Sequence, residues 1–202
     1  MTAVIDPELL QLGPDANGSL LLPAEFDAAE FEEGWRYELL RGVLIVSPAP
    51  SRKERDPNGE LEWLLRDYQE HHPQGSTLDV TLSEETLQTG PDRRRADRVI
   101  WAGLGRLPGP SDLPTIVVEF VSAGRSSRRR DYEEKRTEYL AIGVREYWVI
   151  DRFRRVLTVF SQGSAGFETT TIREHQTYTT PLLPGFELAL ARLLQLADRW
   201  EH

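Results

Sequence analysis

Three acidic residues of this chain stand inside short apolar segments. Glu119 lies in TIVVEFVS, Asp97 in ADRVIW and Glu38 in YELL. Because an unpaired charge is costly to bury, each acid needs a partner. Taken one at a time, each is accounted for by an arginine in a core salt bridge. Taken together, they favour a shared hard cation such as Mg²⁺ or Mn²⁺, which binds carboxylate oxygens and keeps some of its waters.

A lysine follows these acids on the next expected helix. Within DYEEKRTEYLAIG, Asp131, Lys135 and Tyr139 are spaced at i, i+4 and i+8, so they project from nearly one helix face. An exposed ion pair between Asp131 and Lys135 would account for this spacing. If the face instead looks back over the strand with Glu119, Lys135 could hold an attacking water or a scissile phosphate. Spacing alone leaves both interpretations open.

The positive charge of the chain is concentrated in two arginine runs, DRRRADR (92–98) and RSSRRR (125–130). The net charge of −9 argues against binding to nucleic acid through global electrostatics. Runs of this kind are commonly solvated loops, but both lie next to the acids in apolar strands. We therefore also expect local contacts to backbone phosphates from six arginines: Arg93, Arg94, Arg95, Arg128, Arg129 and Arg130.

Composition sets the class of protein. With 202 residues, 39% hydrophobic and 28% charged, the chain fits one ordinary globular domain with a sizeable core. It contains no cysteine, which excludes disulfides and zinc–thiolate sites. No apolar run approaches the roughly 20 residues of a spanning helix, and the first residues lack the pattern of a signal peptide. We expect a cytoplasmic protein with no membrane partner.

Hydrophobic periodicity, together with the residues that begin or end helices and turns, predicts the elements that must position these residues. A hairpin is expected at 35–48 around Arg41-Gly42, and a helix from Asn58 to about His72. The remaining expectations are a short helix at 24–34, strands at 77–84, 96–101, 115–122, 145–151 and 156–160, a helix ending at Gly143, and a final strand and helix. Strand, helix and strand between 115 and 151 predict a crossover unit in a mixed or parallel sheet.

Several of these segments together resemble one family. They are YELLRGVLIVSP, the aspartate of ADRVIW, VVEFVS, RRDYEEKRTEY, GVREYWVID and LPGFELAL. In order and style they resemble the Uma family of restriction endonucleases, a bacterial branch of the PD-(D/E)XK nuclease-like superfamily. The resemblance implies an α/β (α+β) fold with a mixed central β-sheet flanked by helices, a restriction-endonuclease-like core. Residues 1–34 would be an N-terminal extension with short helices, and residues 35–202 a single domain.

The resemblance also implies roles for individual residues. Asp97 and Glu119 match the family's metal ligands, Glu38 a further ligand or water-binding group, and Lys135 the catalytic lysine on the following helix. Asp131 and Tyr139 would be neighbours of this site. The chain departs from the superfamily at two positions, with Ala96 in place of the proline before the aspartate and Val121 where a lysine is expected. Activity therefore requires that Lys135 reach the same point from the helix.

The expected function is hydrolysis of phosphodiester bonds in nucleic acid, with DNA as the expected substrate and Mg²⁺ or Mn²⁺ as cofactor. One alternative is an inactive module of the same fold that binds nucleic acid or a protein partner. Another is an interaction domain whose acids are merely salt-bridged. A homodimer would suit an enzyme that acts on two strands. If Asp97 and Glu119 point to different faces of the sheet, no shared ion is possible.

Overall fold

The computed structural model describes residues 10–163 and 166–200, and of Ser126 and Ser127 the backbone alone. By its contacts the chain divides into two compact units. The first comprises the chain up to Ala49 together with Thr86–Arg95, and the second comprises Pro50–Glu85 together with the chain from Ala96 onward. The expected boundary between residues 34 and 35 falls inside the first unit, and a single domain over 35–202 stays a prediction.

The first unit is built around a β-hairpin. Strands β3 (Trp35–Leu40) and β4 (Val43–Pro48) pair antiparallel, as the sequence predicted. Arg41 and Gly42 both have positive φ, the conformation that a tight two-residue hairpin turn requires. The unit also contains β1 (Gln11–Leu12), a short 3-10 turn η1 (Pro14–Ala16), α1 (Pro23–Ala28) and β2 (Glu30–Phe31). Its core consists of Leu12, Phe26, Tyr37, Leu39 and Leu44.

Two long strands pass through both units. They are β5 (Leu78–Thr89) and β6 (Asp92–Ala102), each longer than expected. The first arginine run therefore lies in a strand rather than in a solvated loop. Within the first unit, Arg93 of β6 is the register partner of Leu39.

The second unit contains a mixed sheet, as expected. Its strand order is β10-β9-β8-β7-β6, with β5 paired to β6. These strands are β7 (Ile116–Phe120), β8 (Glu146–Asp151), β9 (Val156–Gly163) and β10 (Gly166–Arg173). The pair β7–β8 is parallel, which confirms the predicted crossover, whereas β6–β7, β8–β9 and β9–β10 are antiparallel. A separate two-stranded sheet follows, β11 (Thr177–Thr180) and β12 (Leu183–Ala189).

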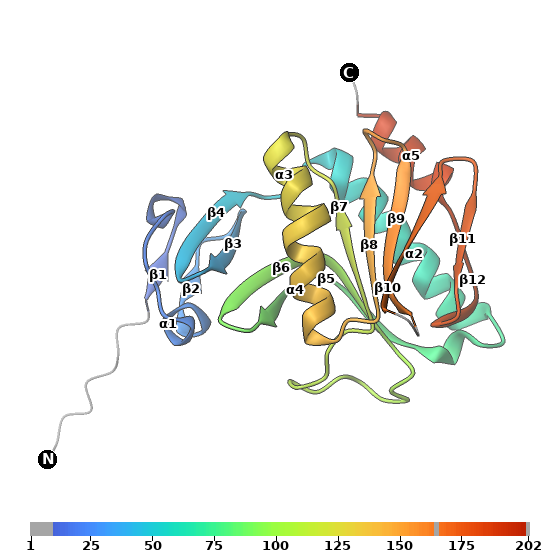
Figure 1. The fold of residues 1–202 in the computed structure, drawn as a ribbon, viewed down its shortest axis with the longest axis horizontal. Helices are drawn as coiled ribbons and strands as arrows, with labels where there is room; N and C mark the ends of the chain where they lie inside the picture. Colours follow the sequence, from blue (N-terminus) through green and yellow to red (C-terminus); the bar gives the residue numbers. More distant parts are fainter. Residues whose placement is uncertain (1–9, 164–165, 201–202) are drawn as a thin grey trace, which may run out of the picture. The chain divides into compact units, whose positions relative to one another are not determined.

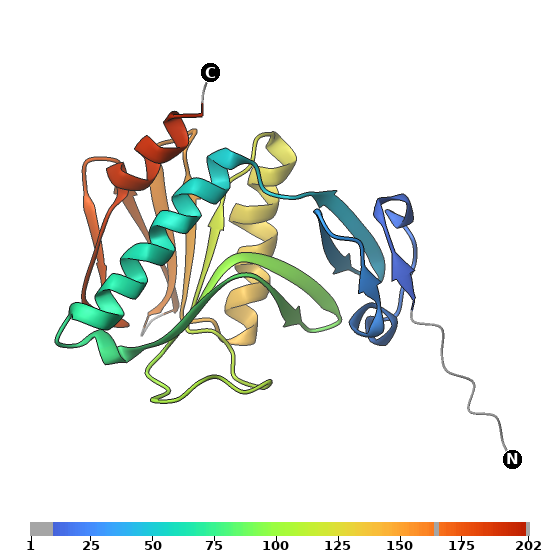
Figure 2. The same ribbon diagram turned by 180° about the vertical axis from the view of Figure 1, so that it is seen from behind.

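Helices cover both faces of this sheet (Figures 1 and 2). One face carries α3 (Arg125–Arg129), a π-helical turn η3 (Arg130–Glu134) and α4 (Lys135–Ile142). The other face carries α2 (Arg52–His71) and α5 (Leu190–Asp198), and a 3-10 turn η2 (Gly75–Thr77) follows α2. No helix in the described ranges is long and apolar enough to cross a membrane.

The start predicted for α2 is wrong. The helix begins at Arg52, where the carboxylate of Glu54 accepts the N–H of Ser51 at 2.7 Å and so satisfies a donor of the first turn. Asn58 lies inside the helix, and its side-chain amide donates to the main-chain oxygen of Asp97 at 2.9 Å. The helix is thereby tied to the strand that carries a predicted site residue.

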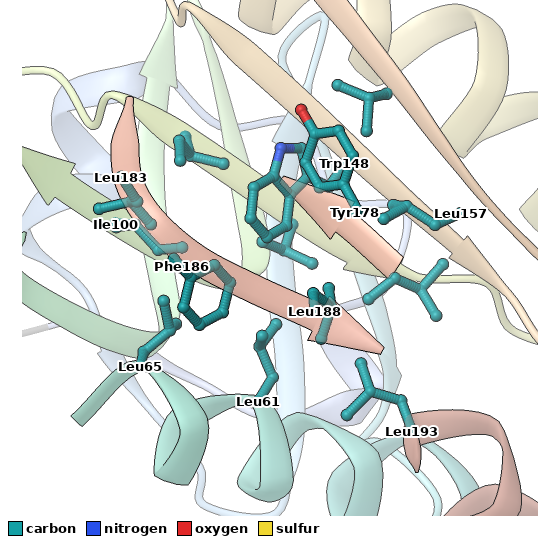
Figure 3. Close-up of a cluster of buried hydrophobic side chains, with 14 of the residues drawn as sticks. Leu61, Leu65, Ile100, Trp148, Leu157, Tyr178, Leu183, Phe186, Leu188 and Leu193 are labelled. Carbon is teal, nitrogen blue, oxygen red and sulfur yellow. The ribbon is translucent and has the colours of Figure 1, made fainter. Parts of the chain in front are cut away.

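Alternation along the strands separates an apolar face from a polar one. Leu61 and Leu65 of α2 pack toward Phe186 and Leu188 of β12 (Figure 3), in a cluster that includes Val118, Trp148 and Ile150 of the sheet. Burying a side chain of this size contributes about 1.5–3 kcal/mol. Because successive strand residues point to opposite faces, Glu119 and Asp151 face the helices α3 and α4 instead. The hydrophobic core thus decides which face holds the acids.

Two glycines near α2 give a test of this packing. A Cβ at Gly75 would lie 2.3 Å from the main-chain oxygen of Tyr68, so Gly75→Ala is expected to lower the free energy of unfolding by about 2 kcal/mol or more. Gly59 lies on the exposed side of α2, and a Cβ added there would meet open space, so Gly59→Ala should raise it by about 0.5–1 kcal/mol. Urea unfolding of both variants measures the change in the free energy of unfolding. If both variants were stabilised, or both destabilised, the result would contradict this packing.

Candidate active site

Asp97 and Glu119 lie on the same face of the sheet. Arg98 of β6 is the register partner of Val118 of β7, so the next pair of this antiparallel register sets Asp97 opposite Glu119. Residues opposite each other in such a pair share a face. Both side chains are buried. The arrangement that would exclude a shared ion is therefore not the one that the structure has.

The neighbouring residue Arg98 confirms this alternation from the other side. Its guanidinium lies on the face of α2, where Nε donates to Asn58 Oδ1 at 2.7 Å and Nη2 donates to Glu62 Oε2 at 2.8 Å. Burial lowers the pKa of Arg98, while Glu62 opposes that shift. Neighbouring residues of β6 thus point to opposite faces of the sheet, with Arg98 toward α2 and Asp97 toward the face that carries α3 and α4.

Lys135 reaches the carboxylate of Glu119. Its Nζ donates to Glu119 Oε1 at 2.8 Å, and the hydroxyl of Tyr139 donates to the same oxygen at 3.1 Å. Lys135 is only 2% exposed, so an exposed surface pair with Asp131 does not describe it. The helix face defined by Asp131, Lys135 and Tyr139 is turned toward the sheet.

A π-helical turn precedes this lysine. In η3 (Arg130–Glu134) the main-chain N–H of Lys135 bonds to the oxygen of Arg130, which widens the helix by one residue. Such bulges occur frequently at functional sites. The turn also buries Asp131, whose Oδ1 accepts Arg130 Nε at 3.1 Å and whose main-chain oxygen accepts the hydroxyl of Tyr147 at 2.9 Å.

The electrostatics of the site show how closely its acids are grouped. Burial raises the pKa of Glu119 to about 8, Lys135 opposes this rise, and the charges of Asp97 and Asp131 add to it. Burial likewise raises the pKa of Asp131. It also raises the pKa of Tyr147 well above its ordinary value, and all three carboxylates push it in the same direction. Burial of these groups near one another thus disfavours the ionised forms of Glu119 and Asp131, while Lys135 and Arg130 oppose this effect.

The carboxylates of Asp97 and Glu119 are of the ligand type that a hard cation takes. Asp97 Oδ2 accepts the N–H of Phe120 at 2.6 Å, and the hydrogen bonds from Lys135 and Tyr139 to Glu119 both end on Oε1. Mg²⁺ is usually held by one or two carboxylates with waters and substrate phosphates. Within the described ranges, no group of three or more histidine, aspartate or glutamate side chains is arranged to hold a metal ion. The fit thus rests on two carboxylates.

Glu38 belongs to the first unit. It is buried in β3, and its Oε1 accepts the main-chain N–H of Arg95 at 3.1 Å. That bond ties the hairpin to the arginine-bearing part of β6 within the same unit. A place for Glu38 in the acidic shell of Asp97 and Glu119 stays a prediction.

The first arginine run is largely buried. The guanidinium of Arg93 donates from Nε and Nη2 to the two carboxylate oxygens of Asp27, each at 2.7 Å, and the pKa of Asp27 is lowered by this bond. Arg94 is 2% exposed, and Arg95 is half-buried. In this run, Arg93 is engaged within its own unit.

The second arginine run is more open. Arg129 exposes 73% of its side chain and lies near Glu133 and Glu134. Arg128 and Arg130 are half-buried, beside Asp151 and Asp131 respectively. Asp151 was not among the predicted site residues, although, like Glu119, it is an acid in an apolar strand, at the end of REYWVID.

The chain is similar to one protein family and to a solved structure. A family model, Uma2, with the description "Putative restriction endonuclease", matches residues 23–191. No curated protein matches the sequence. Among solved structures, a "putative nuclease belonging to DUF820" from Anabaena variabilis superposes with a TM-score of 0.66 at 14% identity, covering 88% of this chain and 99% of that one. At this identity the likeness establishes a shared fold.

The buried pair of Glu119 and Lys135 can be tested by stability. Lys135→Met should lower the free energy of unfolding by about 1–1.5 kcal/mol more near pH 9 than near pH 5, since without its cation Glu119 must stay protonated at a pH where the unaltered chain ionises it. The pKa of Glu119 is raised in the fold, so the protonated form is favoured there. The loss should therefore be small near pH 5 and grow as the pH rises through about 8.

Urea unfolding at several pH values measures this loss. Lys53→Met is the matched control, because Lys53 is half-buried at the start of α2. Adding Glu119→Gln to Lys135→Met should recover part of the loss and remove its dependence on pH. A pH-independent loss in the single variant would contradict the assignment of this pair.

Proposed function

Since the chain belongs to the Uma2 family, described as "Putative restriction endonuclease", we propose that it is a metal-dependent nuclease that hydrolyses phosphodiester bonds of nucleic acid, with DNA as substrate. One observation carries the proposal. Asp97 and Glu119 are set opposite each other on one sheet face, with the ammonium of Lys135 at 2.8 Å from Glu119. Two carboxylates can hold a divalent cation, and a lysine beside them can orient a water or stabilise developing negative charge.

Asp97 and Glu119 would hold the Mg²⁺ or Mn²⁺ ion, and the role of Glu38 as a further ligand or water-binding group stays a prediction from the sequence. When bound, the ion supplies a water of lowered pKa and polarises the phosphoryl oxygen. Its charge would also favour the ionised form of Glu119, whose pKa is otherwise raised by burial.

Lys135 is proposed as the catalytic lysine. Val121, where the superfamily has its lysine, is buried and apolar, and its main-chain N–H bonds to Ile150. The ammonium of Lys135 approaches Glu119 from the helix instead, as the departure at Val121 requires. There it can orient the attacking water or stabilise negative charge on the phosphoryl oxygens. The hydroxyl of Tyr139 fixes the same carboxylate, so Tyr139 is a positioning residue.

The arginine runs would receive backbone phosphates. Local positive charge of this kind allows a chain of net charge −9 to hold nucleic acid. Arg129 is more open than Arg128 and Arg130, whereas Arg93 would first have to leave Asp27. The choice of DNA over RNA and a homodimeric assembly stay predictions.

A second function is favoured by one specific observation. The carboxylate of Glu119 already has an ammonium and a hydroxyl donor at Oε1, as in a completed structural ion pair. On this alternative, the protein is an inactive module of the same fold that binds nucleic acid or a protein partner. Cleavage and metal binding separate the two functions.

Cleavage of plasmid and single-stranded DNA with Mg²⁺ or Mn²⁺ tests the enzyme directly. Asp97→Asn, Glu119→Gln and Lys135→Met should each lower the rate at least about 100-fold, since each removes a group that acts on the metal or on developing charge. Glu168→Gln makes the same carboxylate-to-amide change on the exposed strand β10 and should keep full activity. Cleavage that survives Glu119→Gln unchanged would remove the enzyme as proposed.

Metal binding has a readout apart from activity. Mn²⁺ titrated into the protein and followed by electron paramagnetic resonance should show a bound fraction that is lost in Asp97→Asn and Glu119→Gln. Glu168→Gln should bind as the unaltered chain does. Binding that is equal in all four proteins would place the ion elsewhere and contradict the ligand assignment.

A further inference from the structure

A second group of charged residues lies at the end of β8, apart from the two acids of the site. Asp151 is fully buried, and its Oδ1 accepts the main-chain N–H groups of Phe153 and Arg154, each at 3.0 Å. These bonds shape the turn between β8 and β9. The carboxylate is thus fixed in place before any ligand arrives.

The other oxygen of Asp151 gathers three donors from two segments. Oδ2 lies 3.3 Å from the hydroxyl of Tyr132, 3.6 Å from Arg128 Nε and 3.9 Å from Arg154 Nε. The guanidinium of Arg154 also stands 5.3 Å from the ring centre of Tyr132, within reach of a cation–π contact. One carboxylate therefore holds two guanidinium groups near each other.

This group is positively charged and incompletely bonded. Two guanidinium groups against one carboxylate leave a net positive charge. Arg128 Nε is buried without a hydrogen-bond partner among the described atoms, since 3.6 Å to Asp151 is too long for one. Yet Arg128 and Arg154 expose 33% and 57% of their side chains. Their outer N–H donors can therefore reach an anion from solvent.

The position of the group relates it to Glu119. Val149 of β8 is the register partner of Glu119, and Asp151 follows two residues later on the same face. That is about 7 Å along the strand. Both strands are parallel and end at this edge of the sheet, where ligands of such sheets commonly bind. Adjacent phosphates of one nucleic acid strand are spaced on this scale.

We infer that Arg128 and Arg154, held by Asp151, bind a backbone phosphate of the nucleic acid next to the one at Glu119. The inference rests on the proposed function and names the part of the protein that positions its substrate. Guanidinium groups suit a phosphate because their paired donors match its oxygens. Asp151 acts through the two arginines as a positioning residue. Arg154 lies outside both arginine runs of the sequence.

Binding of labelled duplex DNA over a series of salt concentrations tests this. Fluorescence anisotropy with Ca²⁺ in place of Mg²⁺ compares the unaltered chain with Arg128→Gln, Arg154→Gln and the double variant. The plot of log association constant against log salt has a negative slope, and it should become shallower by about 0.9 for each arginine removed. The control is Arg66→Gln on α2, on the other face, where Arg66 is 52% exposed and pairs with Glu62. Its slope should not change.

Kinetics give a second measurement. Replacing either arginine should raise KM for an oligonucleotide several-fold and leave kcat nearly unchanged, because the phosphate contact positions the substrate and does not take part in the reaction. Asp151→Asn should raise KM in the same way, which a purely structural role would not do at a retained melting temperature. Since Asp151 is buried, the arginine variants decide the outcome if this variant fails to fold.

Two failures are distinguishable. If the unaltered chain cleaves DNA in a manner that depends on Glu119, while the double variant and Arg66→Gln have equal salt slopes, the phosphate site alone is overturned. If the unaltered chain neither cleaves nor binds nucleic acid, the proposed function fails and this inference fails with it.

Discussion

The ion pair between Lys135 and Glu119 is the constraint on which this site depends. Both groups are almost fully buried, and a buried charge without a partner would cost several kcal/mol. The pair is possible because the π-helical turn η3 and the helix α4 bring Lys135 over the strand β7. A buried pair of this kind is weak evidence for stability and a better indicator of function. Here the neighbouring charges of Asp97 and Asp131 favour a functional role for the pair over a role in stability.

The two faces of the sheet in the second unit differ in chemistry, because one is apolar and the other carries buried acids. On one face, Val118, Trp148 and Ile150 pack against α2 and the β12 segment. On the other, Glu119 and Asp151 come within reach of donors from α3, η3 and α4. Strand alternation forces this separation, so the core and the acids are specified by the same backbone. A one-residue shift in register would exchange the two sets and destroy both.

The chain lacks a lysine at Val121, where the superfamily is expected to have one. The proposed nuclease function therefore assigns the catalytic ammonium to another element, the helix that carries Lys135. The structure brings the ammonium of Lys135 to Glu119 from the crossover helix. It also sets a second pair of cations, Arg128 and Arg154, beyond Glu119 at the end of the next strand.

Residue types and periodicity by themselves determined the hairpin at Arg41-Gly42, the parallel crossover from β7 to β8, and the three acids in apolar surroundings. These are local signals, carried by turn conformation, alternation and the cost of burying charge. Only the tertiary structure decided that Arg93 forms an ion pair with Asp27, and that Arg128 and Arg154 both lie next to the carboxylate of Asp151. Such partners are distant in sequence, and their meeting depends on register and packing, which no short segment encodes.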